Sequence, residues 1–79
     1  MLLSMPVVQK FPASRLTIYA ADHLPEHVHV QLRDGRECTV ELAGMKITGR
    51  ISAREIREEL LWIETNRAWL NDEWRRLNP

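Results

Sequence analysis

The chain has 79 residues, a single cysteine, and eleven basic residues that cancel eleven acidic ones. This length allows one domain with a small core, and the lone cysteine, Cys38, excludes a disulfide framework and a zinc site built on paired cysteines. The balanced charge argues against a dedicated non-specific nucleic-acid binder, and no apolar run reaches the ~20 residues of a membrane span.

The N-terminal residues 1–4 carry no structural pattern, so we expect them to be an extension. Met5-Pro6 is then the effective start of a single domain over residues 5–79. The extension is too short for a signal peptide. Together with the lone cysteine, this predicts a cytoplasmic protein without membrane association.

Three segments alternate between apolar and polar side chains, which is the pattern of half-buried β-strands: residues 15–21, 27–32 and 37–42. Pro25 marks the segment before the second strand as a loop. Residues 45–48 are expected to form a short fourth strand. The apolar positions should face one core, and they are Leu16, Ile18, Val28, Val30, Cys38, Val40 and Leu42.

The hairpin between the second and third strands contains Asp34-Gly35. A two-residue loop would pair apolar with polar positions, whereas a three-residue loop, 33–35, pairs Val30 with Cys38 and His27 with Glu41. The longer loop keeps each face uniform, and a one-residue slip would invert the strand. Gly35 suits the left-handed position that such a loop requires.

A helix is predicted to start after Ser52, because Ser52 and Glu55 form a capping box. An apolar stripe follows at helical spacing: Ile56, Leu60, Ile63, Leu70, Trp74 and Leu77. An unbroken helix over 53–77 would be ~37 Å long. That exceeds the diameter of about 30 Å expected for a domain of this size, so the helix either breaks near Asn66 or packs its end on a partner. The expected fold is α+β, a three- to four-stranded antiparallel meander packed against this helix.

Three histidines, His23, His27 and His29, lie within seven residues. His27 and His29 share one side of their strand, and the hairpin register places Glu41 opposite His27. Imidazoles and carboxylates together suit either a metal site or general acid–base catalysis. The spacing matches no strong metal motif. The alternative to both kinds of site is a solvated face in which the histidines cap the loop and pair with Glu41.

Two further polar side chains, Arg15 and Tyr19, lie on the same side of the first strand. Next to His27, His29 and Glu41 they would form a cluster able to bind phosphate and move protons at a ribose hydroxyl. A small metal-independent ribonuclease needs groups of this kind. The alternative is an ordinary polar sheet face.

Trp62 and Trp69 form a second helical stripe, with Leu61 further round the helix. One small sheet cannot cover every apolar position of this helix. We therefore expect Trp62, Trp69 and Leu61 to form a partner surface, in which tryptophan is a typical anchor. A wide core face is the alternative.

The run from Asp22 to Val30, Asp-His-Leu-Pro-Glu-His-Val-His-Val, resembles the prokaryotic family called domain of unknown function 4160, over about residues 5–77. Members typically open with Met-Pro, and this chain departs from them at Glu26, where a second proline is common. The resemblance implies no activity. It does imply a gene neighbour, domain of unknown function 2442, in an arrangement like a toxin–antitoxin pair.

These observations lead to three hypotheses. The first is a protein-interaction component of a toxin–antitoxin-like module, whose partner is the neighbouring gene product or a second copy. The second is a ribonuclease that uses the His27/His29 face, and the third is a metal-binding module in which His23, His27 and His29 are weak candidate ligands. We expect no cofactor, no small-molecule ligand and no membrane partner, whereas RNA is a possible partner.

Overall fold

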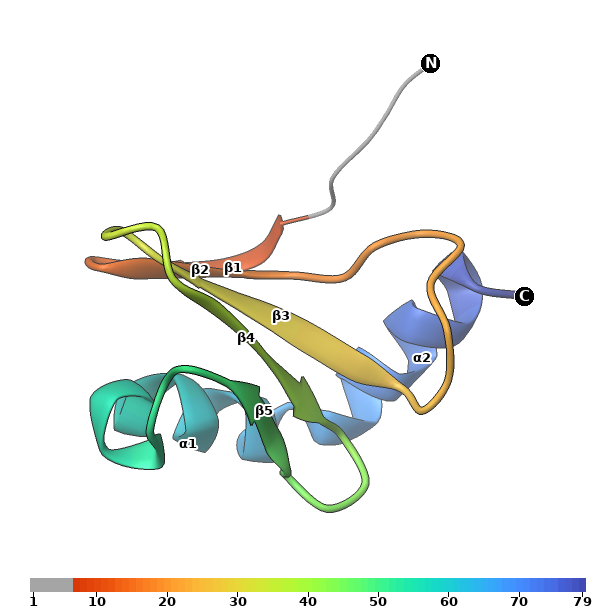
Figure 1. Ribbon diagram of the computed structural model, residues 1–79. Helices are drawn as coiled ribbons and strands as arrows, with labels where there is room; N and C mark the ends of the chain where they lie inside the picture. Colours follow the sequence, from red (N-terminus) through yellow and green to blue (C-terminus); the bar gives the residue numbers. More distant parts are fainter. Residues whose placement is uncertain (1–6) are drawn as a thin grey trace.

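The computed structural model describes residues 7–79. One antiparallel sheet holds the strands in chain order, and two helices follow: β1 (Val7–Phe11), β2 (Ser14–Thr17), β3 (His27–Leu32), β4 (Glu37–Glu41), β5 (Ile47–Gly49), a 3-10 turn (Ala53–Ile56), α1 (Arg57–Thr65) and α2 (Arg67–Leu77). Both helices lie on the same face of the sheet (Figure 1). The predicted α+β meander is confirmed. The expected extension at residues 1–4 and the Met5-Pro6 start lie outside the described residues.

The sheet has five strands, so the prediction of three or four was too low. The missed strand is β1, which lies at the edge of the sheet beside β2. It begins with two consecutive valines, and the register shifts between Val7 and Gln9, so the residues do not alternate regularly between apolar and polar. Alternation of apolar and polar residues therefore does not predict this strand.

The three-residue hairpin loop between β3 and β4 is confirmed. Val30 lies opposite Cys38, and His27 lies opposite Glu41. The amide of Gly35 donates to the carbonyl of Leu32, and Gly35 has φ +97°. That left-handed conformation is the one for which glycine is favoured.

The core lies between the sheet and the helices. All seven positions predicted to face inward are buried there, and they meet Ile56 of the 3-10 turn and Ile63 of α1. Leu60, predicted to join them, is partly buried at the edge of the same cluster. Leu70 and Trp74 of α2 complete the core.

The C-terminal helix is broken at Asn66, one of the two predicted outcomes. The amide of Asn66 and its side-chain Nδ2 both donate to the carbonyl of Trp62, which closes α1. Leu70 then donates to the carbonyl of Asn66 as α2 begins. The break turns α2 so that it stays on the sheet instead of overhanging it.

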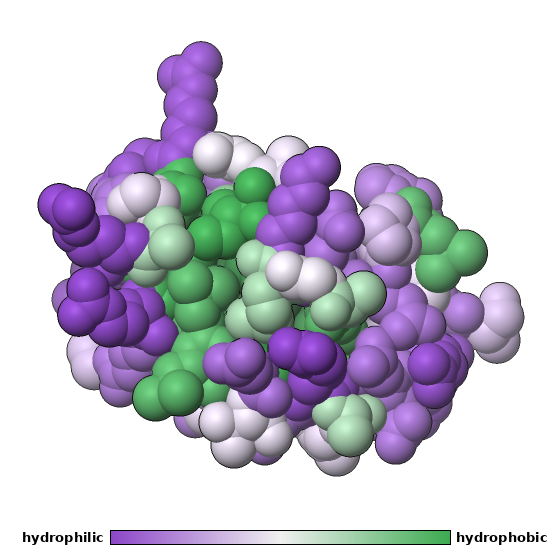
Figure 2. Space-filling view, turned by 90° about the horizontal axis from the view of Figure 1, so that it is seen from below, coloured by the Kyte–Doolittle hydropathy of each residue, from purple (hydrophilic) through white to green (hydrophobic). Residues whose placement is uncertain are grey.

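The side of the molecule on which α1 and β5 lie shows a central apolar area bordered by polar side chains (Figure 2). Large apolar side chains that stand out from the surface include Leu61, which is 65% exposed, and Trp69, which is 48% exposed. Within residues 7–79, no helix is long and apolar enough to cross a membrane.

Candidate functional site

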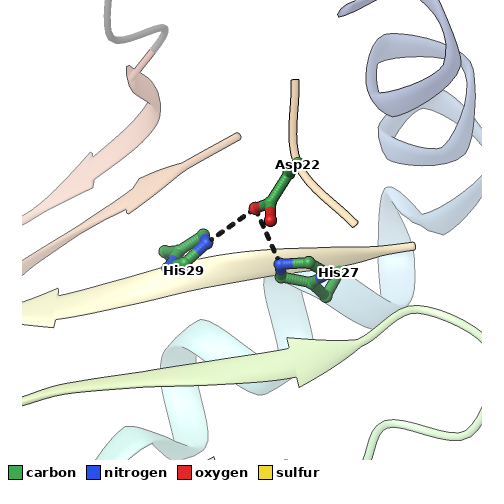
Figure 3. A group of neighbouring side chains, drawn as sticks. All are labelled: Asp22, His27 and His29. Atoms are coloured by element: carbon green, nitrogen blue, oxygen red, sulfur yellow. Dashed lines mark hydrogen bonds and ion pairs between the residues drawn. The ribbon is translucent and has the colours of Figure 1, made fainter. Parts of the chain in front are cut away.

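His27 and His29 lie on the face of the sheet that points away from the helices, two residues apart on β3. Asp22, from the loop before β3, reaches over both rings (Figure 3). Its Oδ2 lies 2.9 Å from Nε2 of His27 and 3.1 Å from Nε2 of His29. One carboxylate oxygen thus joins two imidazoles, and we call these three residues the Asp22 triad.

The second nitrogen of each ring also has an oxygen partner. Nδ1 of His27 lies 2.7 Å from the carbonyl oxygen of Pro25, and Nδ1 of His29 lies 2.8 Å from Oε2 of Glu37. Neither oxygen has a hydrogen to give when Glu37 is ionised, so each Nδ1 must be the donor. This places a hydrogen on Nδ1 of both rings and directs both Nε2 atoms at Asp22.

The Asp22 loop is held in place by the opposite end of the chain. The amide of Asp22 donates to Oδ1 of Asn78, whose Nδ2 donates to the carbonyl oxygen of Tyr19. Between these two anchor points, Ala21 has φ +58°, a left-handed conformation that is uncommon for residues other than glycine. The turn at Ala21 points Asp22 back toward β3, and Asn78 holds the turn beside the end of α2 (Figure 1).

The surroundings of Asp22 favour its ionised form. Burial opposes ionisation, but hydrogen bonds from His29 and from the backbone N–H of His23, with the charge of nearby imidazoles, outweigh it and lower the pKa. A carboxylate is therefore available at neutral pH. The triad combines one anionic oxygen with two imidazole nitrogens in a partly enclosed position.

A hydrogen-bonded network continues from the triad across the sheet. Glu37 accepts from His29 through one oxygen and from Nε2 of Gln31 through the other. Gln31 also donates to the hydroxyl of Tyr19 and accepts from Nε of Arg15. The structure therefore brings Arg15 and Tyr19 onto the same face as the two histidines, where the sequence placed them.

The remaining candidates lie further from the triad. The side chain of His23 is 84% exposed, with its Nε2 3.7 Å from Oδ1 of Asp22. Glu41 lies opposite His27 in register, yet the hydrogen bonds of His27 go to Asp22 and Pro25. The expected pairing partner is replaced by a loop residue, because the loop folds over the strand.

The residues proposed as a partner surface are divided between two environments. Trp62 packs partly against the core, whereas Leu61 and Trp69 are exposed. Trp62 thus serves the wide core face that was the alternative interpretation for this stripe.

Sequence reasoning did not identify Glu37, Gln31 and Asn78 as part of the site. Glu37 lies diagonally across from His29, whereas the predicted register gives only the residues that lie directly opposite each other. Gln31 alternates with the histidines on β3, so the strand pattern contained its position. Asn78 lies 56 residues from the amide that it anchors, and no local pattern connects the two.

Among curated proteins and among solved structures, nothing matches the chain. The model of the family described as "Domain of unknown function (DUF4160)" matches residues 14–75, which include the whole Asp22 triad. The match covers most of the chain, so this protein belongs to the family of domain of unknown function 4160.

Proposed function

We propose that this protein is a metal-binding module that holds a divalent transition-metal ion at the Asp22 triad. The observation that carries the proposal is the direction of the ring nitrogens. Each Nδ1 is committed to an oxygen of Pro25 or Glu37, and each Nε2 faces the same carboxylate oxygen.

The two rings crowd around a single carboxylate oxygen. Their centroids lie 5.1 Å apart, the side chain of His27 is only 5% exposed, and both Nε2 atoms lie against Oδ2 of Asp22. Polar atoms in such an enclosed position need partners. One divalent cation would bond to both ring nitrogens and to the carboxylate at once.

The donor atoms fit a metal ion with a small adjustment. In a tetrahedral zinc site, bonds of ~2.1 Å place neighbouring donor atoms about 3.4 Å apart. The two Nε2 atoms lie 2.9 and 3.1 Å from Oδ2, so the Asp22 carboxylate needs to withdraw by a few tenths of an ångström. The three donor atoms all lie within 4.8 Å of one another. Imidazole and carboxylate are ligands that zinc and related metals accept.

The outer contacts match those of established metal sites. A metal-bound histidine usually donates its other N–H to a carboxylate or backbone carbonyl, which fixes its orientation. Here Glu37 and the carbonyl of Pro25 play these parts. Three protein ligands leave a coordination position for water or substrate, and a metal in such a position makes water more acidic.

The direct test is metal binding by the purified protein. Isothermal titration with zinc and the visible spectrum of the cobalt-loaded protein should show one bound ion with low coordination number. Asp22→Asn and His29→Ala should abolish binding. His23→Ala is the matched control, because His23 belongs to the same segment but is exposed, and it should bind normally.

Two results would overturn the proposal: no zinc binding by the folded protein, or equal loss of binding in His23→Ala and His29→Ala. RNA cleavage that persists in EDTA and is lost in His27→Ala and His29→Ala would instead support the metal-independent ribonuclease.

Leu61 and Trp69 favour a second function, a protein-interaction component of a toxin–antitoxin-like module. Both are large apolar side chains on the outer side of the helices, and both are exposed. Exposed tryptophan is a typical anchor for a partner, and exposed apolar surface marks interaction sites. Growth of a bacterial host that expresses this gene alone and with its neighbour tests the idea. A monomer in sedimentation that does not change when the neighbouring product is added would contradict it.

A further inference from the structure

A row of polar side chains crosses the outer face of the sheet next to the row that contains His29. Lys10 on β1 lies opposite Arg15 on β2, and Arg15 lies opposite Gln31 on β3. The amide of Arg33 donates to the carbonyl of Ala13, which brings the start of the β3–β4 turn beside the β1–β2 turn. Three cationic residues from separate parts of the chain therefore meet at one end of the sheet.

These cations line one depression of the surface. Its lining residues, within the described part of the chain, include Lys10, Arg15, Arg33 and Gln31 but no carboxylate. Among residues 7–79, none of the three cations forms an ion pair. The chain as a whole carries no net charge, so this concentration of unpaired positive charge is a local feature.

Two carboxylates at the borders of this row are engaged elsewhere. Asp34 accepts from the side chain and the amide of Arg36, and these contacts lower its pKa, the backbone hydrogen bond most strongly. Glu37, at the other end of the row, accepts from His29 and Gln31. Neither carboxylate neutralises the cationic depression.

Arg15 is also held in a suitable orientation. Its Nε donates to Oε1 of Gln31 at 2.8 Å, and Gln31 is itself held by Tyr19 and Glu37. The terminal amino groups of the guanidinium keep their donors for an external acceptor. A guanidinium with free donors in a fixed plane matches the oxygens of a phosphate group.

The position of the depression relates it to the Asp22 triad. Gln31 and His29 point to the same face of β3, two residues or ~7 Å apart. The ring of Tyr19 lies between them, edge-on to His29 with 4.6 Å between centroids. A cationic row beside an aromatic ring is the arrangement that tracks the backbone and bases of a single strand.

We infer that the depression formed by Lys10, Arg15 and Arg33 binds a backbone phosphate of single-stranded nucleic acid, whose strand then runs along β3 past Tyr19. This goes beyond the metal-binding function and does not depend on it. The neutral overall charge predicts weak binding with a small number of phosphate contacts.

The test is fluorescence anisotropy with a labelled twelve-nucleotide single strand of uridylate, measured in EDTA so that metal binding plays no part. Arg33→Ala should weaken binding about tenfold. It should also reduce the dependence of log affinity on log salt by about 0.7. Arg15→Lys should weaken binding as well, because it keeps the charge but loses the planar donors.

Arg57→Ala is the matched control, because it removes an arginine that is also exposed but lies on α1 and does not line this depression. Its affinity and salt dependence should equal those of the parent protein. Equal losses in Arg57→Ala and Arg33→Ala would overturn the inference, as would a double-stranded probe that binds as tightly as the single strand. Circular dichroism of each variant verifies that the fold is retained.

Discussion

Alternate side chains of β3 enter two different environments. Val28 and Val30 are fully buried against the helices, while His27 and His29 lie on the opposite face beneath the Asp22 loop. The helix-facing side holds the domain together through packing. The outer side holds a network of oriented polar groups, which depends on that packing but contributes little to it. Substitutions on the two faces should therefore fail in different ways.

The largest expected effect is on stability, from the helix side. Ile63→Ala removes a fully buried side chain that packs against the sheet and should lower the free energy of unfolding by about 3 kcal/mol. A domain of this size has a total of about 4–12 kcal/mol, so the loss is severe. Urea unfolding followed by circular dichroism measures it.

Leu61→Ala is the control for this substitution, because Leu61 lies on the same helix but is 65% exposed. Its effect should stay within about 0.5 kcal/mol. The folded fraction of Ile63→Ala should still bind zinc as the parent does. If that affinity falls as much as in His29→Ala, the two faces are not independent.

The core could be predicted from sequence because alternation and turn chemistry are local. Val28, Val30 and Cys38 were placed by their alternation, and the uniformity of the two faces decided the hairpin register, which Gly35 allows. The strand β1 escaped because its bulge removes the alternation. At the site, the sequence placed His27 and His29 on one face but paired His27 with Glu41.

The position of Asp22 over the histidines required two facts that no local pattern contains. One is the left-handed conformation of Ala21, a residue without a preference for it. The other is the hydrogen bond from the Asp22 amide to Asn78, at the other end of the chain. A site is therefore hard to predict from sequence when it is closed by a loop that a distant residue holds in place.

Neighbouring residues of β4 also enter different environments: Cys38 points into the core and Thr39 points outward. Burial, and after it the negative charges of Glu37 and Glu59, raise the pKa of the Cys38 thiol to about 11. At pH 8 its thiolate fraction should be about 100-fold below that of a thiol with the ordinary pKa of 9.0, and alkylation by iodoacetamide should be correspondingly slow.

Mass spectrometry of timed reactions gives the rate. Unfolding in urea should restore rapid alkylation of Cys38. As an outward-facing control, Thr39→Cys in a Cys38→Ala background should react much faster than Cys38 does in the native protein. Equal rates for the two thiols would contradict the assignment of faces on this strand.

On the outer face, Glu37 should act through His29. Glu37→Gln removes the negative charge that accepts the Nδ1 hydrogen, so the ring becomes a weaker and less well oriented ligand. Zinc affinity should fall about tenfold, with unfolding free energy almost unchanged. Isothermal titration measures the affinity. Glu41→Gln, opposite His27 but outside its hydrogen bonds, should leave zinc affinity as it is, and a loss there equal to that of Glu37→Gln would refute this role.

The smallest effect is expected where the sheet joins the helices. Hydrogen bonds from Arg36, and then from the Ser52 backbone, lower the pKa of Glu55 to about 2 from 4.5. Because the folded state lowers this pKa, Glu55 stabilises the fold fully above about pH 5, and the contribution is lost as pH falls toward 2.

The unfolding free energies of the parent and Glu55→Gln should therefore differ at pH 6 and converge between pH 5 and pH 2. Comparing the two proteins at each pH cancels the titration of the other carboxylates, which both share. Since Glu55 is exposed to solvent, high salt should shrink the difference at pH 6. A difference that stays constant down to pH 2 would mean that Glu55 acts through the shape of the helix start rather than through its charge. Glu55 would then stabilise the fold in the way that the core residues do, through local geometry and packing, and its charge would play no part.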